Sequence, residues 1–376
     1  MSRLDVFTVD VSEKTTWILL RLTGDDGILG AGEATLNNRT SDVLAAIPDA
    51  VACIEESAFS SANRLAAVRQ MIPGVIGRVI GSALEQAWLD REGKRLGRPV
   101  HALLGGAYRD AVPCYANINR GTLSRTPSEF ADRAALAIGD GYGAVKLAPF
   151  DDVTPDACDE ALREQAIEAG FARIDAVVRK LEGAGAVQVD CHSRFRGAEA
   201  GDILTRVAAS GVVWFEEPIA ETRDALEKIA QLRRMAQTQG IRLAGAEKCA
   251  DTRDFLPFIT GHCYDVIMPD IVLAGGPREV VWIGHLAAGL DCGVSLHNPC
   301  GPVMDMHSVH VAAAVPSLVS LERQFRETAL YDEIITHRAH HLCDGAIELS
   351  DTEGVGMDVD WTHPTLDQKA TWNVNL

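Results

Sequence analysis

The chain has 376 residues, enough for one large domain or two, and its 47% hydrophobic and 23% charged residues are typical of a globular protein with a sizeable core. Its formal net charge of −18 argues against a nucleic-acid partner, because phosphate binding requires clustered Lys and Arg side chains. The nine cysteines are scattered from Cys53 to Cys343 without a Cys-x-x-Cys pair, which indicates reduced thiols and argues against a disulfide framework.

The first residues, MSRLDVFTVDVSEKT, lack the basic start and the apolar core of a signal peptide. No stretch of the sequence approaches the ~18 apolar residues that a membrane span requires. We therefore expect a cytoplasmic protein without a membrane partner.

The first hundred residues combine strand patterns with helical patterns. Residues 4–11 and 17–36 alternate like two or three antiparallel strands, with Gly-Asp-Asp-Gly at 24–27 as a turn signal. Helical periodicity follows over 41–96, and Gly97 and Pro99 form its stop signal. This pattern predicts an α+β unit over residues 1–110.

From Ala111 onward, short apolar runs alternate with amphipathic helical stretches. The runs lie at 112–118, 143–150, 186–192, 212–217, 241–247, 265–270, 292–297 and 318–322. Runs that are apolar on both faces and separated by helices predict parallel strands buried under those helices. Eight such units favour an α/β fold with a closed barrel over residues 111–330, whose chemistry lies at the carboxyl ends of the strands. Residues 331–376 look irregular, and we expect this tail to fold back onto the N-terminal unit.

Acidic residues stand at the ends of three successive predicted strands. Asp190 follows the apolar part of the third run, and Glu216 follows the apolar part of the fourth run. Glu247 is the last residue of the fifth run. Adjacent strands lie about 4.8 Å apart, so three carboxylates at their tips can converge on one hard cation such as Mg²⁺. One strand-end acid alone would more simply cap the next helix, but three in succession favour a metal site. Alternation points Glu217 away from the side that Glu216 faces, and we favour Glu216 as the ligand.

Two further strand ends carry groups suited to proton transfer. Asp270 ends the sixth run and His297 the seventh, so they can be neighbours. A carboxylate on one imidazole nitrogen fixes the tautomer and raises the basicity of the other, which predicts a general-base dyad. The alternative is that His297 only caps a helix. His192 lies two residues after Asp190, on the same side if the strand stays extended, and could be an acid, a hydrogen-bond donor or a ligand.

Three more charged residues lie at or beside strand ends. Lys146 is in the second run, Glu322 ends the eighth, and Lys248 follows Glu247. Either lysine could neutralise a carboxylate of the acidic rim or position a substrate oxygen, and the sequence leaves both alternatives open.

The ordered motifs VDCH, FEEP, GAE, MPD and SLHNPCGP resemble the barrel motifs of the enolase superfamily, specifically its mandelate racemase subgroup. WILLRLTGDDGILGAGEATL and ALEQAWLDREGKRLGRPVHALLGG resemble the capping domain of that family and its junction with the barrel. The resemblance covers nearly the whole chain. It implies a modified TIM barrel, (β/α)7β, capped by an α+β domain that 331–376 completes. It also implies Mg²⁺ held by Asp190, Glu216 and Glu247, and removal of a proton next to a substrate carboxylate to give an enediolate.

One difference from the family pattern indicates a subtype. Many relatives carry Lys-x-Lys at the end of the second strand, with the second Lys as a base, whereas this chain has Lys146-Leu147-Ala148. Members that dehydrate acid sugars with Asp-x-His at the third strand resemble this chain better. The resemblance then implies that His297 takes the alpha proton, Asp270 orients it, and His192 protonates the leaving 3-hydroxyl, giving a 2-keto-3-deoxy acid. Glu322 would hydrogen-bond the substrate carboxylate.

Other outcomes stay open for the substrate and the reaction. The alternative reactions are cycloisomerisation of a sugar lactone or related carboxylate, and epimerisation or racemisation. A non-catalytic scaffold is disfavoured, because the three strand-end acids and the predicted dyad of Asp270 and His297 are intact. The partner is expected to be a small carboxylate, an aldonate or an aldarate, and the protein a homo-oligomer. The candidate substrate contacts are Asn37, Arg39, Asn119, Arg194 and Lys248, with the turn at 24–27, Asn38 and Arg120 beside them.

Overall fold

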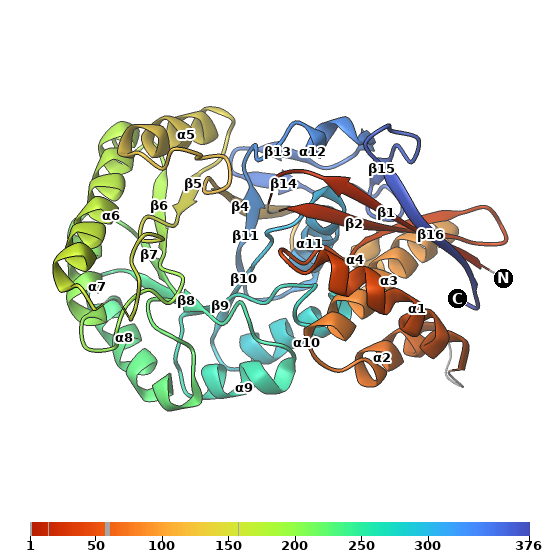
Figure 1. The fold of residues 1–376 in the computed structure, drawn as a ribbon, viewed down its shortest axis with the longest axis horizontal. Coiled ribbons are helices and arrows are strands. Elements are labelled where there is room, and N and C mark those ends of the chain that lie inside the picture. Colours follow the sequence, from red (N-terminus) through yellow and green to blue (C-terminus); the bar gives the residue numbers. More distant parts are fainter. Residues whose placement is uncertain (1, 14, 57–60, 157) are drawn as a thin grey trace.

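The computed structural model describes residues 2–376 apart from residues 14, 57–60 and 157. Figure 1 shows a barrel surrounded by helices in one half of the molecule and a separate sheet with helices α1–α3 in the other half. The two chain ends lie beside each other, and Ser2 Oγ donates to the carbonyl of Leu376 at 2.6 Å. Within the described part of the chain, no helix is long and apolar enough to cross a membrane.

The N-terminal residues form an antiparallel sheet in the order β16-β1-β2-β3. Its strands are β1 Ser2–Asp10, β2 Thr16–Thr23, β3 Leu29–Glu33 and β16 Asp367–Val374. The helices that follow β3 are α1 Thr40–Glu56, α2 Ser61–Met71 and α3 Gly74–Leu96. The prediction of two or three antiparallel strands is confirmed, and their number is three. The predicted helical region is confirmed as well, except that its residues 57–60 lie outside the described residues.

Helix α3 packs directly on β3 because glycines remove the side chains between them. A Cβ atom on Gly32 would lie 2.0 Å from the carbonyl oxygen of Ala83, so the close approach requires glycine at this position. The helix ends as predicted, since Gly97 adopts the left-handed conformation (φ 61°) and its N–H bonds to the last turn.

Eight parallel strands close into a barrel, because β11 pairs with β4 as well as with β10. The strands are β4 Ala111–Asn117, β5 Ala144–Leu147, β6 Ala186–Asp190, β7 Trp214–Glu216, β8 Arg242–Gly245, β9 Val266–Ile267, β10 Gly293–Leu296 and β11 Leu318–Gln324. Each of the eight predicted runs overlaps one of these strands.

One long helix follows each of the first seven barrel strands, which is the (β/α)7β arrangement. These helices are α5 Pro127–Gly139, α6 Glu160–Leu181, α7 Ala200–Ala209, α8 Leu226–Thr238, α9 Thr252–Thr260, α10 Pro277–Ala288 and α11 Pro302–Ala314. Short helical turns occur at α4 Val100–Leu103, η1 Arg223–Ala225 and α12 Leu330–Glu333. The predicted fold class is confirmed.

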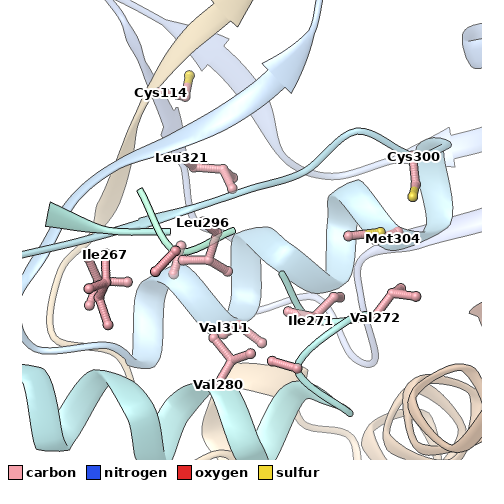
Figure 2. Packing of buried hydrophobic residues seen from close by; sticks show 14 of the residues in the cluster. Cys114, Ile267, Ile271, Val272, Val280, Leu296, Cys300, Met304, Val311 and Leu321 are labelled. Atoms are coloured by element: carbon pink, nitrogen blue, oxygen red, sulfur yellow. The ribbon is translucent and has the colours of Figure 1, made fainter. Parts of the chain in front are cut away.

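The main apolar core lies between the barrel strands and the helices outside them. Figure 2 shows Ile267 of β9 and Leu296 of β10 together with Val280 of α10 and Val311 of α11, all fully buried. Burial of one such side chain contributes about 1.5–3 kcal/mol. A second cluster comprises Trp214, Ala244, Val266 and Met268. Because side chains alternate along a strand, Val266 joins this second cluster inside the barrel while Ile267 faces the helices.

The C-terminal tail is more regular than the sequence indicates. Strand β12 (Ile335–Arg338) pairs with β15 (Met357–Val359), and β13 (His341–Cys343) pairs with β14 (Ala346–Glu348). Strand β14 also pairs with β4 of the barrel, whereas β16 joins the N-terminal sheet. The expectation of an irregular tail is therefore wrong, because strands of three or four residues are too short for a readable alternation. The division of the chain at residues 110 and 331 stays a prediction.

The N-terminal unit contacts the two barrel loops that carry Asp270 and His297. Glu33 at the end of β3 accepts hydrogen bonds from the N–H groups of Gly301 (2.6 Å) and Met304 (3.0 Å) at the start of α11. On α3, Ser82 Oγ donates to the carbonyl of Ile271 at 2.7 Å. These bonds hold the loops after β9 and β10 in place against the N-terminal unit.

Buried histidines join the same interface. His307 of α11 donates from Nε2 to the carbonyl of Ala31 at 2.9 Å, and its Nδ1 is buried without a hydrogen-bond partner. Burial lowers the pKa of His307 to about 4. Burial also lowers the pKa of His101, His310 and His340, whose rings lie together nearby. The folded protein therefore holds these imidazoles in the neutral form.

We expect acid to destabilise the fold through His307. Between about pH 6.5 and pH 4 the unfolded chain binds a proton at His307 that the folded protein excludes. The free energy of unfolding is therefore highest above this window and falls as the pH is lowered through it, by roughly 3 kcal/mol for the full shift. The variant His307→Gln retains a donor for Ala31 and should show a shallower loss. Thermal unfolding midpoints at pH 7 and pH 4.5 measure this; an equal drop in both proteins would contradict it.

Candidate active site

Three buried carboxylates converge at the carboxyl ends of adjacent barrel strands. Asp190 and Glu216 are the last residues of β6 and β7 and face each other in register, and Glu247 lies two residues after β8. One carboxylate oxygen from each lies within 4.8 Å of the others, and all three residues are buried. We call this set the acidic triad.

The acidic triad is a cluster of buried like charges, and Lys146 lies beneath it. Burial and the charge of Asp190 raise the pKa of Glu216 well above its ordinary value. Lys146 Nζ lies 2.7 Å from Glu216 Oε1 and 3.8 Å from Asp190 Oδ2. Burial would lower the pKa of Lys146, but Glu216 and Glu322 more than offset this and hold it well above its ordinary value. Lys146 offsets part of the repulsion between the carboxylates, and the acidic triad presents an all-oxygen donor set that fits a divalent cation.

The second oxygen of Glu216 is held from inside the barrel. Trp214 Nε1 donates to Glu216 Oε2 at 2.8 Å, and Tyr115 lies beneath Lys146, whose Nζ is 5.3 Å from the ring centroid. We did not predict Trp214 as part of the site. It stands two residues before Glu216 on the same strand, so the alternation rule places both side chains on one side and could have identified it.

The backbone turns sharply where the triad strands end. Positive φ values, which residues other than glycine rarely adopt, occur at His192 (φ 48°), Ser193 (φ 59°), Glu217 (φ 38°) and Ala246 (φ 71°). Such conformations cost about 1–3 kcal/mol each and are maintained by the surrounding structure. The assumption of an extended backbone from Asp190 to His192 is therefore wrong, although the His192 side chain still reaches Asp190.

Glu216 and Glu217 point to different sides, in agreement with alternation. Glu217 Oε1 accepts hydrogen bonds from Ser193 Oγ and from Lys248 Nζ. Lys248 Nζ also lies 3.9 Å from Glu247 Oε1, and its side chain is 61% exposed. Lys248 therefore lies at the outer edge of the acidic triad, paired with a carboxylate.

His297 and Asp270 form the predicted pair. The His297 Nδ1 lies 2.9 Å from Asp270 Oδ2, and its Nε2 lies 3.4 Å from Glu247 Oε2. Burial would lower the pKa of His297, but the charge of Glu247 and the hydrogen bond to Asp270 raise it to about 10. Because Asp270 holds Nδ1, Nε2 is the nitrogen that faces the acidic triad.

His192 lies at the other end of the acidic triad. Its Nε2 is 3.0 Å from Asp190 Oδ2, and its Nδ1 is 2.7 Å from Asp151 Oδ1. The charge of Asp190 and the hydrogen bond to Asp151 raise the pKa of His192 to about 12, against the effect of burial. We did not predict Asp151. It follows the second apolar run, so the strand-end rule that selected Asp190 could also have selected it.

Glu322 closes the site from β11. Its Oε2 accepts the N–H of Asn298 at 3.1 Å, its Oε1 accepts a hydrogen bond from Asn117 Nδ2, and Lys146 Nζ lies 3.4 Å from Oε1. Burial would raise the pKa of Glu322, but Lys146 and His297 more than offset this and lower it. The carboxylate is therefore ionised and can only accept hydrogen bonds.

The candidate substrate contacts are not gathered in one place. Arg39 pairs with Asp42 in the first turn of α1, with both side chains about half exposed. The turn at 24–27 contacts Arg91 of α3, at the opposite end of β3 from Glu33, so the geometry does not support this turn as a substrate loop. The sequence pattern could not show that this turn lies away from Glu33, because a turn signal predicts a turn without saying which part of the protein the turn faces.

The other four candidates differ in whether the protein already uses their polar atoms. Asn119 Oδ1 accepts the N–H of Ala148 at 2.6 Å and so ties the ends of β4 and β5 together. Asn37 has a buried Oδ1 without a hydrogen-bond partner, and Arg194 has a buried Nε without one. Arg120 is paired with Glu327 at 3.1 Å. Asn37 and Arg194 thus retain unused polar atoms, whereas Asn119 and Arg120 already bind protein groups.

Comparison with known proteins identifies related sequences over most of the chain. Residues 5–105 match the family described as Mandelate racemase / muconate lactonizing enzyme, N-terminal domain, and residues 129–363 match the family described as Enolase C-terminal domain-like. The chain is 26% identical to the D-xylonate dehydratase of Haloferax volcanii over 367 residues, which cover 95% of this chain and 86% of that protein.

Two further comparisons agree with this assignment. The chain is 30% identical to the D-gluconate dehydratase of Thermoproteus tenax over 278 residues, or 74% of this chain and 54% of that protein. The solved structure of a mandelate racemase/muconate lactonizing enzyme-like protein from Roseovarius sp. TM1035 has a TM-score of 0.82 at 24% identity, covering 96% of this chain and 93% of the other. The structural likeness supports the fold.

We expect a divalent cation, with Mg²⁺ as the probe, to stabilise the folded protein through the acidic triad. A ligand that binds only the folded state contributes about 2.7 kcal/mol at 100 times its Kd. Mg²⁺ should therefore raise the thermal unfolding midpoint of the wild type, and Glu216→Gln should lose most of this rise. Glu217→Gln is the matched control, since it makes the same change on the neighbouring carboxylate. Equal responses of the two variants, or the reverse order, would contradict the assignment of Glu216.

Proposed function

Since the chain belongs to the mandelate racemase/muconate lactonizing enzyme family of the enolase superfamily, we propose that it is a Mg²⁺-dependent hydro-lyase that dehydrates an acid sugar to a 2-keto-3-deoxy acid. The names of the relatives, D-xylonate dehydratase and D-gluconate dehydratase, support an aldonate as the substrate. We further propose that the protein acts in the cytoplasm and as a homo-oligomer.

The observation that carries the proposal is the placement of two imidazoles at opposite ends of the acidic triad. His297 faces Glu247 at one end, and His192 faces Asp190 at the other. Dehydration of a sugar acid requires a base for the alpha proton and an acid for the departing 3-hydroxyl. Racemisation by two bases would require a second base at the end of β5, where this chain has Ala148 in place of a second Lys.

In the proposed reaction the neutral form of His297 accepts the alpha proton at Nε2, while Asp270 holds Nδ1 and keeps the ring oriented. The charge of Glu247, which raises the pKa of His297, would be offset by the bound cation, and this favours the neutral form. The electron pair of the broken C–H bond first moves into the carboxylate group and gives an enediolate. This electron pair then forms the C2–C3 double bond as the C3–O bond breaks and His192 donates a proton from Nε2, so that water leaves. The resulting enol takes up a proton at C3 and loses the proton of its C2 hydroxyl, which gives the 2-keto-3-deoxy acid. When bound by Asp190, Glu216 and Glu247, Mg²⁺ would act as a Lewis acid for the negative charge that develops on the substrate carboxylate.

Lys146 and Glu322 have supporting parts in this proposal. Lys146 stays charged and paired with Glu216, which supports a role as a counter-charge and not as a base. We propose that Glu322 contacts the substrate carboxylate; because the pKa of Glu322 is lowered in the free protein, a hydrogen bond between the two groups would require a shared proton. Its bonds to Asn117 and Asn298 support a role in orienting those residues.

We expect incubation with Mg²⁺ and a panel of aldonates and aldarates to yield a 2-keto-3-deoxy acid from at least one aldonate. Proton NMR and mass spectrometry identify the product, and chelation of the metal should abolish its formation. Glu216→Gln, prepared in the same way, controls for contaminating activity. An epimerised or cyclised product without keto acid would show a different reaction of the same superfamily.

We expect His297→Asn to lower kcat/KM for dehydration by about 10²–10⁴-fold, the usual contribution of a general base. The control is His262→Asn, because His262 is exposed after α9 and its φ of 49° suits asparagine. Steady-state kinetics measure both variants, and Mg²⁺ binding should persist in each. Full turnover by His297→Asn would exclude this residue as the base.

A further inference from the structure

His192 is held at both ring nitrogens. Its Nδ1 lies 2.7 Å from Oδ1 of Asp151, in the loop after β5, and its Nε2 lies 3.0 Å from Oδ2 of Asp190. The Asp151 contact engages the nitrogen that points away from the acidic triad. The orientation of this imidazole therefore depends on a residue outside the triad.

His297 is held in the same way at the other end of the acidic triad. Asp270 contacts its Nδ1 at 2.9 Å, and Glu247 faces its Nε2 at 3.4 Å. The two histidines follow β6 and β10, with β7, β8 and β9 between them in the barrel. In both pairs an aspartate outside the triad takes Nδ1 and a triad carboxylate faces Nε2. The pair Asp151–His192 thus has the geometry of the pair Asp270–His297.

Both aspartates are also anchored through their second oxygen. Asp270 Oδ1 accepts the N–H groups of Val272 (2.7 Å) and Leu273 (3.0 Å). Asp151 Oδ2 accepts Nη2 of Arg125 at 3.0 Å. Each carboxylate therefore uses one oxygen as a fixed anchor and offers the other to an imidazole.

Arg125, which lies just before α5, is fixed in turn by the loop after β5 and by helix α6. Its guanidinium donates to the carbonyl of Ala148 at 2.5 Å, and its own carbonyl accepts Nε of Arg173 of α6 at 2.8 Å. An ion pair between mobile, exposed side chains contributes little. The side chains of Asp151 and His192 are 30% and 37% exposed. Because Arg125 fixes the Asp151 carboxylate, this carboxylate can hold the imidazole of His192 in one orientation.

We propose that Asp151 is a positioning residue that holds the His192 ring with Nε2 toward the acidic triad, a role that rests on the function proposed above. Without the Asp151 carboxylate the ring can rotate about its side-chain bonds, while the His297–Asp270 pair is unchanged. Removal of the alpha proton by His297 then continues. Cleavage of the C3–O bond slows, because the hydroxyl leaves as water only when His192 supplies its proton.

The test compares Asp151→Asn with Asp152→Asn, which makes the same change one residue later on a carboxylate paired with Arg173. The substrate is the aldonate that the wild type dehydrates fastest. We expect Asp151→Asn to lower kcat by about 10–100-fold with little change in KM, within the range of general-acid effects. In D2O it should also return substrate deuterated at the alpha carbon. Asp152→Asn should match the wild type.

A fluorinated substrate separates positioning of the acid from general damage to the site. In the 3-deoxy-3-fluoro analogue the C3–F bond breaks and fluoride leaves without a proton. Fluoride release by Asp151→Asn should therefore approach the wild-type rate. A loss of fluoride release equal to the loss of dehydration would overturn the proposal, as would wild-type dehydration by Asp151→Asn.

An NMR measurement on the metal-free protein tests the role of Asp151 independently of the proposed dehydration. With ¹⁵N-labelled imidazoles, the Nδ1 signal of His192, assigned by its absence in His192→Asn, should shift in Asp151→Asn and stay unchanged in Asp152→Asn. If the wild type dehydrates no acid sugar, the proposed function fails and this shift alone decides the role of Asp151. An unshifted signal in a folded Asp151→Asn protein overturns the proposal.

Discussion

The mutual repulsion of Asp190, Glu216 and Glu247 is the constraint on which the rest of this site depends. Like charges confined within 4.8 Å in a buried rim raise the free energy of the fold unless other groups offset them. Lys146 and the indole of Trp214 do so from below, and the two histidines do so at the ends. A chain that retains such a costly cluster indicates a function that needs it, because hydrophobic residues at these positions would be more favourable for folding alone.

Much of the fold could be predicted because barrel strands carry a strong periodic signal. The eight apolar runs correspond to the eight observed strands, and Asp190 and Glu216 are strand ends as expected. Strand order then determines neighbours, so the proximity of Asp270 to His297 follows from the sequence by a simple rule. These features are predictable because each depends on local pattern and on the order of strands along the chain.

The remaining features depend on loop conformation, which a sequence pattern does not specify. His192 reaches Asp190 through a left-handed turn and not along an extended strand. Asp151 meets His192 only because the loops after β5 and β6 fold toward each other, 41 residues apart in sequence. Arg39 and Lys248 were plausible substrate contacts by composition, yet each pairs with a nearby carboxylate. Chemistry that sits on strand ends is thus easier to predict than the contacts that orient it.

The pairing of β16 with β1 has a consequence for how the protein is made. Strand β1 leaves the ribosome long before its partner β16 (Asp367–Val374), because almost the whole barrel lies between them in the sequence. One edge of the N-terminal sheet therefore stays open until β16 has been synthesised, although β2 can pair at once. Open edges of this kind invite association with other chains, so we expect nascent molecules to need shielding by chaperones until β16 has paired.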